Sequence, residues 1–251
     1  MPNFMNVDAD EVHKTTSNFK YSAIEIDKLE GSEYTVVQIL VDATGSVFNF
    51  KTELESAVKS VVESCKKSPR SENLLVRVAT FNSNGIEEVH GFTLLSNINV
   101  DDYDGCVNPS GMTPLWDASL NAVEALQTYG KQLFSQEYLC NGIFFVITDG
   151  GENSSRVADL DKIKSTISSI RVNEELESVD AILIGVNDSH TSLRQELDKY
   201  KEDAGFDQYV SLGDVSPGKL AKLAQWVSNS ISSTSQVLGT GGASNPVSWS
   251  I

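Results

Sequence analysis

Oxygen-bearing side chains occur in three short stretches that lie far apart in the sequence. The first places a carboxylate and two hydroxyls at alternating positions, namely Asp42, Thr44 and Ser46. The second contains Thr113, and the third contains Asp149 before two glycines. Two carboxylates with several hydroxyls make a set of hard oxygen ligands, which suits Mg²⁺, with Mn²⁺ or Ca²⁺ as alternatives. Two negative charges leave a dication incompletely neutralised, so such an ion would accept one more anionic oxygen from outside the chain.

These stretches are flanked by segments with the patterns of regular secondary structure. Short apolar runs, most of them nearly continuous, are typical of parallel strands buried on both faces, and they occupy residues 36–41, 74–79, 143–147 and 181–184. Apolar residues at helical spacing predict amphipathic helices, with stripes within residues 54–65, 115–126, 160–170, 193–200 and 220–231. Strands alternating with helices predict an α/β fold with a doubly wound, mostly parallel sheet and helices on both faces.

Two local signals refine this expectation. Residues 76–83 and 86–95 look like two strands joined by Asn84-Gly85, a dipeptide typical of tight hairpins, so one antiparallel strand is expected at the sheet edge. Thr113 is expected to cap the following helix, with Pro114 at its first position. Ligands in open α/β sheets bind beyond the carboxyl ends of the strands, where the three oxygen-bearing stretches are expected to meet.

Together the three stretches resemble the metal-ion-dependent adhesion site (MIDAS) of von Willebrand factor type A (VWA) domains. The resemblance rests on Asp42-x-Thr44-x-Ser46, on Thr113 in Gly-Met-Thr-Pro-Leu-Trp-Asp, and on Asp149 in Ile-Thr-Asp-Gly. It implies that the three hydroxyls bind a metal ion, while the two aspartates bind it directly or through water. It also implies a non-enzymatic protein-binding module whose partner protein supplies a glutamate or aspartate carboxylate as the sixth ligand. The family's usual middle serine is Thr44 here, which keeps the hydroxyl and adds a methyl group.

Other interpretations of the same residues remain open. Asp42 and Asp149 could be strand-end aspartates that stabilise turns, in a domain that serves as a structural scaffold in a multiprotein assembly. A Mg²⁺-dependent hydrolase or phosphotransferase could also use a similar sheet, because haloacid-dehalogenase-like enzymes have a nucleophilic aspartate. Those enzymes have a second aspartate two positions later for acid/base chemistry, where this chain has Thr44. A non-enzymatic role is therefore favoured, and no catalytic residue is assigned.

Composition excludes several classes of partner. In 251 residues there are 19 lysines and arginines against 35 aspartates and glutamates, a net charge of −16. Such a chain is repelled by phosphate backbones and anionic membrane surfaces, which argues against nucleic-acid and membrane partners. No apolar run approaches the roughly 20 residues of a membrane-spanning helix, and no secretory signal is evident. The three cysteines are widely spaced and predict neither a disulfide framework nor a zinc site, so we expect a cytoplasmic protein.

The sequence also suggests how the chain is divided. Residues 1–32 are polar and are expected to be an irregular N-terminal extension, residues 33–231 to form the VWA-like domain, and residues 232–251 to be a flexible Ser/Gly-rich tail. The acidic run at residues 101–105 is interpreted as a solvated turn. Asp117 lies in the first turn of a predicted helix, where a carboxylate is favourable, and is interpreted as structural or as supporting the metal ligands.

Overall fold

A mixed sheet forms the centre of the molecule in the computed structural model, which describes residues 10–173, 175–238 and 247–249. Within these residues eight strands pair in the order β1-β2-β5-β4-β3-β6-β7-β8. Their bounds are β1 (Asp10–Lys14), β2 (Lys20–Ile24), β3 (Glu33–Asp42), β4 (Leu74–Asn82), β5 (Gly85–Leu94), β6 (Leu139–Thr148), β7 (Val179–Gly185) and β8 (Gln208–Ser211).

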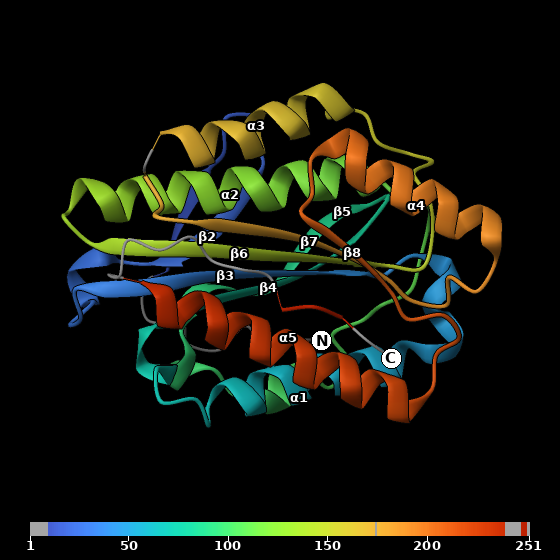
Figure 1. Ribbon diagram of the computed structural model, residues 1–251, viewed down its shortest axis with the longest axis horizontal. Helices are drawn as coiled ribbons and strands as arrows, with labels where there is room; N and C mark the ends of the chain where they lie inside the picture. Colours follow the sequence, from blue (N-terminus) through green and yellow to red (C-terminus); the bar gives the residue numbers. More distant parts are fainter. Residues whose placement is uncertain (1–9, 174, 239–246, 250–251) are drawn as a thin grey trace.

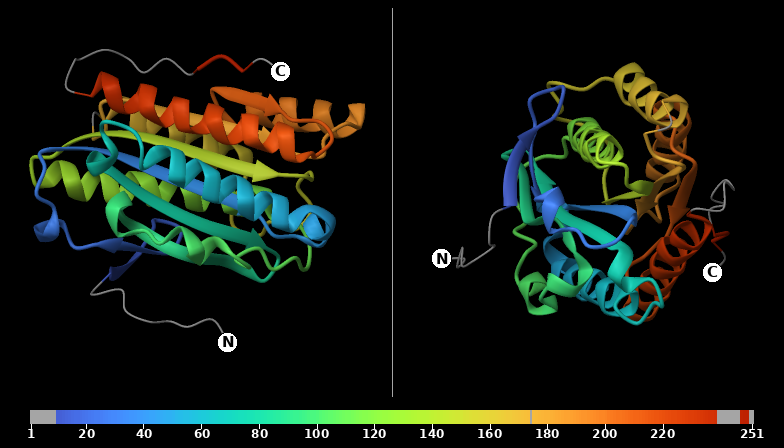
Figure 2. Two further views of the ribbon diagram at one scale, coloured as in Figure 1. Left: turned by 90° about the horizontal axis from the view of Figure 1, so that it is seen from below. Right: turned by 90° about the vertical axis from the view of Figure 1, so that its left-hand side faces the viewer.

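Helices cover both faces of the sheet, as Figures 1 and 2 show. The α-helices are α1 (Lys51–Cys65), α2 (Leu115–Ser135), α3 (Leu160–Val172), α4 (Thr191–Ala204) and α5 (Pro217–Val237). Helices α2, α3 and α4 pack on one face, and α1 and α5 lie side by side on the other. The predicted α/β architecture with a mostly parallel sheet is therefore confirmed. None of the helices in the described part of the chain is long and apolar enough to span a membrane.

The central strands are buried because both faces of the sheet are covered. Every residue of β7 is buried, and nine of the ten residues of β3 are buried as well. Strand β3 pairs in parallel with β4 on one side and with β6 on the other. Near-continuous apolar runs in the sequence thus correspond to strands with helices on both sides.

The predicted hairpin is confirmed, but it does not lie at the edge of the sheet. Strands β4 and β5 are antiparallel, and the loop between them consists of Ser83 and Asn84, one residue earlier than expected. Beyond β5 the sheet continues, because β2 pairs with β5 in parallel at Ala23 and Phe92, and β1 pairs with β2. The edge position expected for β5 is taken by β1.

The first 32 residues are not uniformly irregular, contrary to expectation, because they contain β1 and β2. Tyr21, Ala23 and Ile24 are buried against the α2 side of the sheet. Residues 1–9 lie outside the described part of the chain. At the other end, α5 extends six residues past the expected domain boundary, to Val237.

Part of the expected C-terminal tail packs back onto α5. The Trp249 ring lies edge-on to Trp226, with centroids 5.5 Å apart, and Trp226 Nε1 donates a hydrogen bond to the Val247 carbonyl at 2.9 Å. Residues 239–246 and 250–251, which the tail prediction also covers, lie outside the described residues.

Candidate metal site

The three oxygen-bearing stretches meet at one edge of the sheet. Asp42 is the last residue of β3, and Asp149 directly follows β6. Because β3 and β6 are adjacent and parallel, their carboxyl ends lie side by side. Thr113 lies two residues before α2, in the segment that leads to the same edge.

Hydrogen bonds fix the segment before α2 against the loop after β3. Gly45 N donates to the Gly111 carbonyl at 3.2 Å, and Ser110 N donates to the Ala43 carbonyl at 2.9 Å. The Asn82 side chain at the end of β4 donates to Ser110 Oγ at 3.2 Å. The first two stretches are therefore held in a fixed relation, independently of the candidate ligands.

Four of the five predicted site residues form one network of side-chain and backbone contacts. Asp42 Oδ1 accepts a hydrogen bond from Thr44 N at 2.8 Å, and Asp42 Oδ2 accepts one from Thr148 Oγ1 at 2.7 Å. Ser46 Oγ donates to Asp149 Oδ1 at 2.7 Å and lies 3.0 Å from Thr44 Oγ1. The two hydroxyls thus connect the loop after β3 to the carboxylate after β6.

Thr113, the fifth residue, lies beside this network. A Cβ atom added at Gly150 would be 3.5 Å from Thr113 Oγ1, so the hydroxyl is close to the backbone that follows Asp149. The Thr113 backbone pairs with Asn153, since Thr113 N donates to Asn153 Oδ1 at 2.7 Å and Asn153 N donates to the Thr113 carbonyl at 3.1 Å.

The expectation that Thr113 caps α2 is wrong. Helix α2 begins at Leu115, and the residue at its N-cap is Pro114, which has no side chain able to accept a hydrogen bond. A residue of the loop after β6 supplies a hydrogen-bond acceptor to the first turn of α2, since Glu152 Oε2 accepts a hydrogen bond from Trp116 N at 2.9 Å. The Thr113 hydroxyl is therefore not used as a helix cap.

Burial dominates the electrostatics of the site. Asp42 is fully buried, Asp149 is 7% exposed, and Ser46 is exposed. Burial raises the pKa of Asp42 to about 6; hydrogen bonds from Thr44 and Thr148 lower this pKa, and the charge of Asp149 raises it. Burial also raises the pKa of Asp149, against the hydrogen bond from Ser46. Both carboxylates are thus costly to keep ionised without a nearby cation.

The donor set fits a hard divalent cation. Within the described residues neither carboxylate has an ion-pair partner. Nor does any group of three His, Cys, Asp or Glu side chains able to hold a metal occur in that part of the chain. The candidate site has two carboxylates, and its remaining donors are hydroxyl oxygens, a combination that suits Mg²⁺ or Ca²⁺ rather than metals that prefer sulfur or nitrogen.

Sequence reasoning missed Glu152 and Asn153, two of the residues that hold the loop after Asp149. Asp117, interpreted as structural or supporting, uses its carboxylate to bind this loop, since it accepts hydrogen bonds at 2.8–2.9 Å from the backbone nitrogens of Arg156, Val157 and Ala158. Asn153 and Glu152 bind the same loop to the start of α2. No local pattern indicates these contacts, because their partners lie about 40 residues away in the sequence.

Asp117→Ala is expected to loosen this loop, because three backbone N–H groups lose their acceptor. The free energy of unfolding should fall by about 1–3 kcal/mol, and the amides of residues 156–158 should exchange hydrogen faster. Hydrogen exchange followed by mass spectrometry measures the second effect. Asp198→Ala, at an exposed position on α4, is the control and should change stability by less than about 0.5 kcal/mol. Unchanged exchange at residues 156–158 would contradict the role given to Asp117.

No family model matches the sequence, and no curated protein is significantly similar to it in sequence. Solved structures do share its fold. The D319A mutant of the PilB minor pilin from Streptococcus sanguinis is similar with a TM-score of 0.56 and 14% identity, over 82% of this chain and 63% of the pilin chain. The open conformation of the pilus adhesin SpaC from Lactobacillus rhamnosus GG is similar with a TM-score of 0.55 and 12% identity, over 86% of this chain and 32% of the adhesin chain.

Proximal thread matrix protein 1 from the mussel byssus is a third structure with this fold. Its TM-score is 0.50 at 18% identity, over 81% of this chain and 46% of the mussel chain. The chain thus spans about two thirds or less of each of these proteins. The α/β fold that the sequence predicts is shared with these three proteins, and at these identities the likeness concerns the fold alone.

Proposed function

We propose that this chain is a non-enzymatic protein-binding module that engages an acidic residue of a partner protein through a divalent metal ion. Asp42, Thr44, Ser46, Thr113 and Asp149 would hold the ion. The observation that carries the proposal is the pair of buried carboxylates, which are linked through the Thr44 backbone nitrogen and the Thr44 and Ser46 hydroxyls and have no ion-pair partner among the described residues. A bound dication would supply the missing positive charge and attract a partner's carboxylate.

The chain's own residues would set the direction of approach. Asp42, Thr44 and Thr113 are buried, whereas Ser46 is exposed. A partner's carboxylate would therefore reach the ion from the side of Ser46. The backbone bonds between the loops keep the donors in place before any ion binds, which reduces the ordering cost of binding.

Two observations favour binding over catalysis. The position where a haloacid-dehalogenase-like enzyme has its acid/base aspartate is Thr44, whose hydroxyl cannot exchange protons readily at neutral pH. The structures with this fold include a pilin, a pilus adhesin and a matrix protein, whose names describe assembly and adhesion. A screen for phosphatase and esterase activity in Mg²⁺ tests the alternative, and turnover that Asp42→Asn abolishes would overturn the proposal.

Asp42→Asn is expected to weaken binding of Mg²⁺ or Mn²⁺ by at least about 100-fold, because it removes a buried negative ligand while keeping the side-chain shape. Thr113→Ala should weaken it by about 10-fold or more. Isothermal titration calorimetry measures the affinities, and circular dichroism checks the fold of each variant. Asp198→Asn on α4 removes the same charge at an exposed position and should bind as the unmodified chain does. Equal affinity of the Asp42→Asn variant would refute the metal site.

The metal-bridged partner requires a second measurement. Proteins captured on the immobilised chain in Mg²⁺ are eluted with EDTA, in parallel with columns that carry Asp42→Asn and Asp198→Asn. We expect a protein that EDTA releases from the unmodified and Asp198→Asn columns and that the Asp42→Asn column fails to capture. Capture that is the same on all columns and indifferent to EDTA would indicate a scaffold role without the metal.

A further inference from the structure

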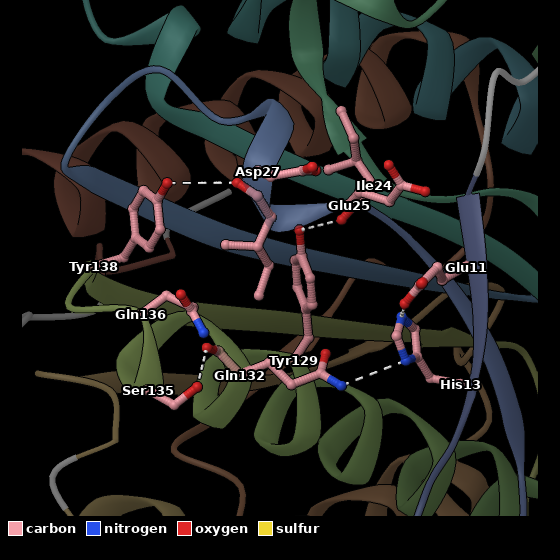
Figure 3. A pocket seen from close by; sticks show the side chains of 11 residues that line it. Glu11, His13, Ile24, Glu25, Asp27, Tyr129, Gln132, Ser135, Gln136 and Tyr138 are labelled. Carbon is pink, nitrogen blue, oxygen red and sulfur yellow. Dashed lines mark hydrogen bonds and ion pairs between the residues drawn. The ribbon is translucent and has the colours of Figure 1, made fainter.

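A cavity of about 670 Å³ lies far from the candidate metal site. One wall is the C-terminal part of α2, and the opposite wall is formed by β1, the end of β2 and the short 3-10 helix Ile26–Lys28 (Figure 3). The metal site is near Leu115 at the start of α2, whereas the cavity is lined by Gln132, 17 residues further along. At about 1.5 Å per residue, the two lie about 25 Å apart along the helix.

The cavity has an apolar and aromatic interior whose polar groups are largely engaged. Of its apolar and aromatic lining residues, Ile24 and Tyr129 are buried, whereas Ile26 and Tyr138 are partly exposed. Tyr129 Oη donates to the Ile24 carbonyl at 3.2 Å, and Tyr138 Oη donates to the Ile26 carbonyl at 3.4 Å. Figure 3 shows Tyr129 extending from α2 toward the backbone of the opposite wall. Both hydroxyls are thus committed to this wall, and the partly exposed Tyr138 ring is left to contact a ligand.

The polar part of the lining is acidic and rich in hydrogen-bond acceptors. Glu11, Glu25 and Asp27 line the cavity together with two glutamines and a serine. Lys28 pairs with Glu25 at 3.4 Å, and His13 lies 3.8 Å from Glu11. Asp27 is exposed and has no hydrogen bond or ion pair among the described residues, so its carboxylate is free to meet a ligand at the mouth of the cavity. Local negative charge therefore exceeds local positive charge.

His13 on β1 connects the opposite wall to α2 across the cavity. Its Nδ1 atom lies 3.4 Å from Gln132 Nε2, and its ring stacks on Tyr21 at 5.2 Å. Figure 3 shows Glu11, His13 and Gln132 in a row along one side of the cavity. Two separate secondary-structure elements are thus held at a fixed spacing, and the cavity between them does not depend on a ligand to form.

We propose that this cavity binds an organic cation that carries an ammonium or guanidinium group on an aliphatic stem. An anion is excluded by the three carboxylates, and a purely apolar ligand would desolvate them without replacing their hydrogen bonds to water. A basic side chain matches both halves of the lining, because its N–H groups can reach the carboxylates while its stem packs on the partly exposed Ile26 and Tyr138 side chains. The volume is in the range of small-ligand sites.

Two sources could present this group, namely a basic segment of a partner protein and a free polyamine, and a titration with hexalysine peptide and with spermine distinguishes them. We expect at least one probe to bind the full chain and to lose about tenfold in affinity in the double variant Glu25→Gln/Asp27→Asn. If the affinity per probe charge is higher for hexalysine than for spermine, the ligand is a protein segment. If it is higher for spermine, the ligand is a free amine. Both outcomes support a cation site.

The matched control removes the same two charges elsewhere. Asp198→Asn/Glu202→Gln changes two exposed carboxylates on α4 and should leave both affinities within about twofold, because general attraction to an acidic chain is weak and screened by salt. An equal loss in the two double variants would show non-specific attraction and overturn the proposal, as would the absence of binding by both probes. Amide chemical shifts of Gln132 and His13 should move on binding, and unmoved signals at these residues would also overturn it.

Discussion

Arg77→Ala is expected to lower the free energy of unfolding by about 3–5 kcal/mol, because it removes the fully buried cation of an ion pair whose carboxylate is partly buried. The Arg77 side chain on β4 is fully buried, and its Nε donates to Glu88 on β5. Its Nη1 donates to Gln38 Oε1 at 2.7 Å and to Asn121 Oδ1 at 3.0 Å. One guanidinium therefore links three strands and α2, and its loss leaves the Glu88 carboxylate without its cation and two amide oxygens without this donor. Urea unfolding followed by circular dichroism measures the change.

Two further variants isolate this mechanism. Arg77→Met/Glu88→Gln removes both charges and keeps most of the volume, so it should recover part of the stability that Arg77→Ala loses. Glu87→Gln removes an exposed charge next to Glu88 and should cost less than about 0.5 kcal/mol. A loss below 1 kcal/mol for Arg77→Ala would show that the network contributes little to folding.

Gly91→Ala is expected to cost about 3 kcal/mol or more, because β2 and β5 approach too closely for a side chain. A Cβ at this position would lie 2.3 Å from the Ser22 carbonyl oxygen and 2.5 Å from its carbon. Both are backbone atoms, so the added methyl group would force β2 away from β5. These two strands pair only at Ala23 and Phe92, so the displacement would disrupt their pairing. We expect faster hydrogen exchange throughout β1 and β2 and earlier unfolding in urea.

Gly218→Ala is the control for this substitution. It adds the same methyl group near the start of α5, where no atom lies within 4 Å of the new Cβ, and alanine favours the helix. Its stability should be equal to that of the unmodified chain or up to about 1 kcal/mol higher. If Gly91→Ala unfolded at the same urea concentration, the close approach of β2 to β5 would be wrong.

The elements that sequence patterns predicted are those whose burial is visible in their own residues. Strand β3 is buried over almost its whole length, and so its apolar run is continuous. Strands β1 and β2 were missed because they have five residues each and carry charges. Their place in the sheet depends on distant contacts, such as the hydrogen bonds that Glu88 accepts from Ser22 N at 3.1 Å and Ser22 Oγ at 2.7 Å.

For the candidate site, the residues at the strand ends were predictable, whereas their partners in the loops were not. The topological rule for parallel sheets places the ends of β3 and β6 together, and the structure brings Asp42 and Asp149 to that edge. Thr148 and Asn153 were missed, although both contact predicted site residues directly. Their partners are determined by how loops fold against each other, which spacing along one segment does not encode. Whether a metal ion binds there stays a prediction.

Helix α2 extends from the candidate metal site to the acidic cavity. It has 21 residues without interruption, so it extends about 30 Å. Its first turn adjoins the candidate metal site, and its last turns line the acidic cavity. If both proposals hold, a partner's carboxylate and an organic cation would bind at opposite ends of this helix without touching each other. The length of this helix would then set the distance between two bound ligands of opposite charge, and the chain would link them without direct contact between them.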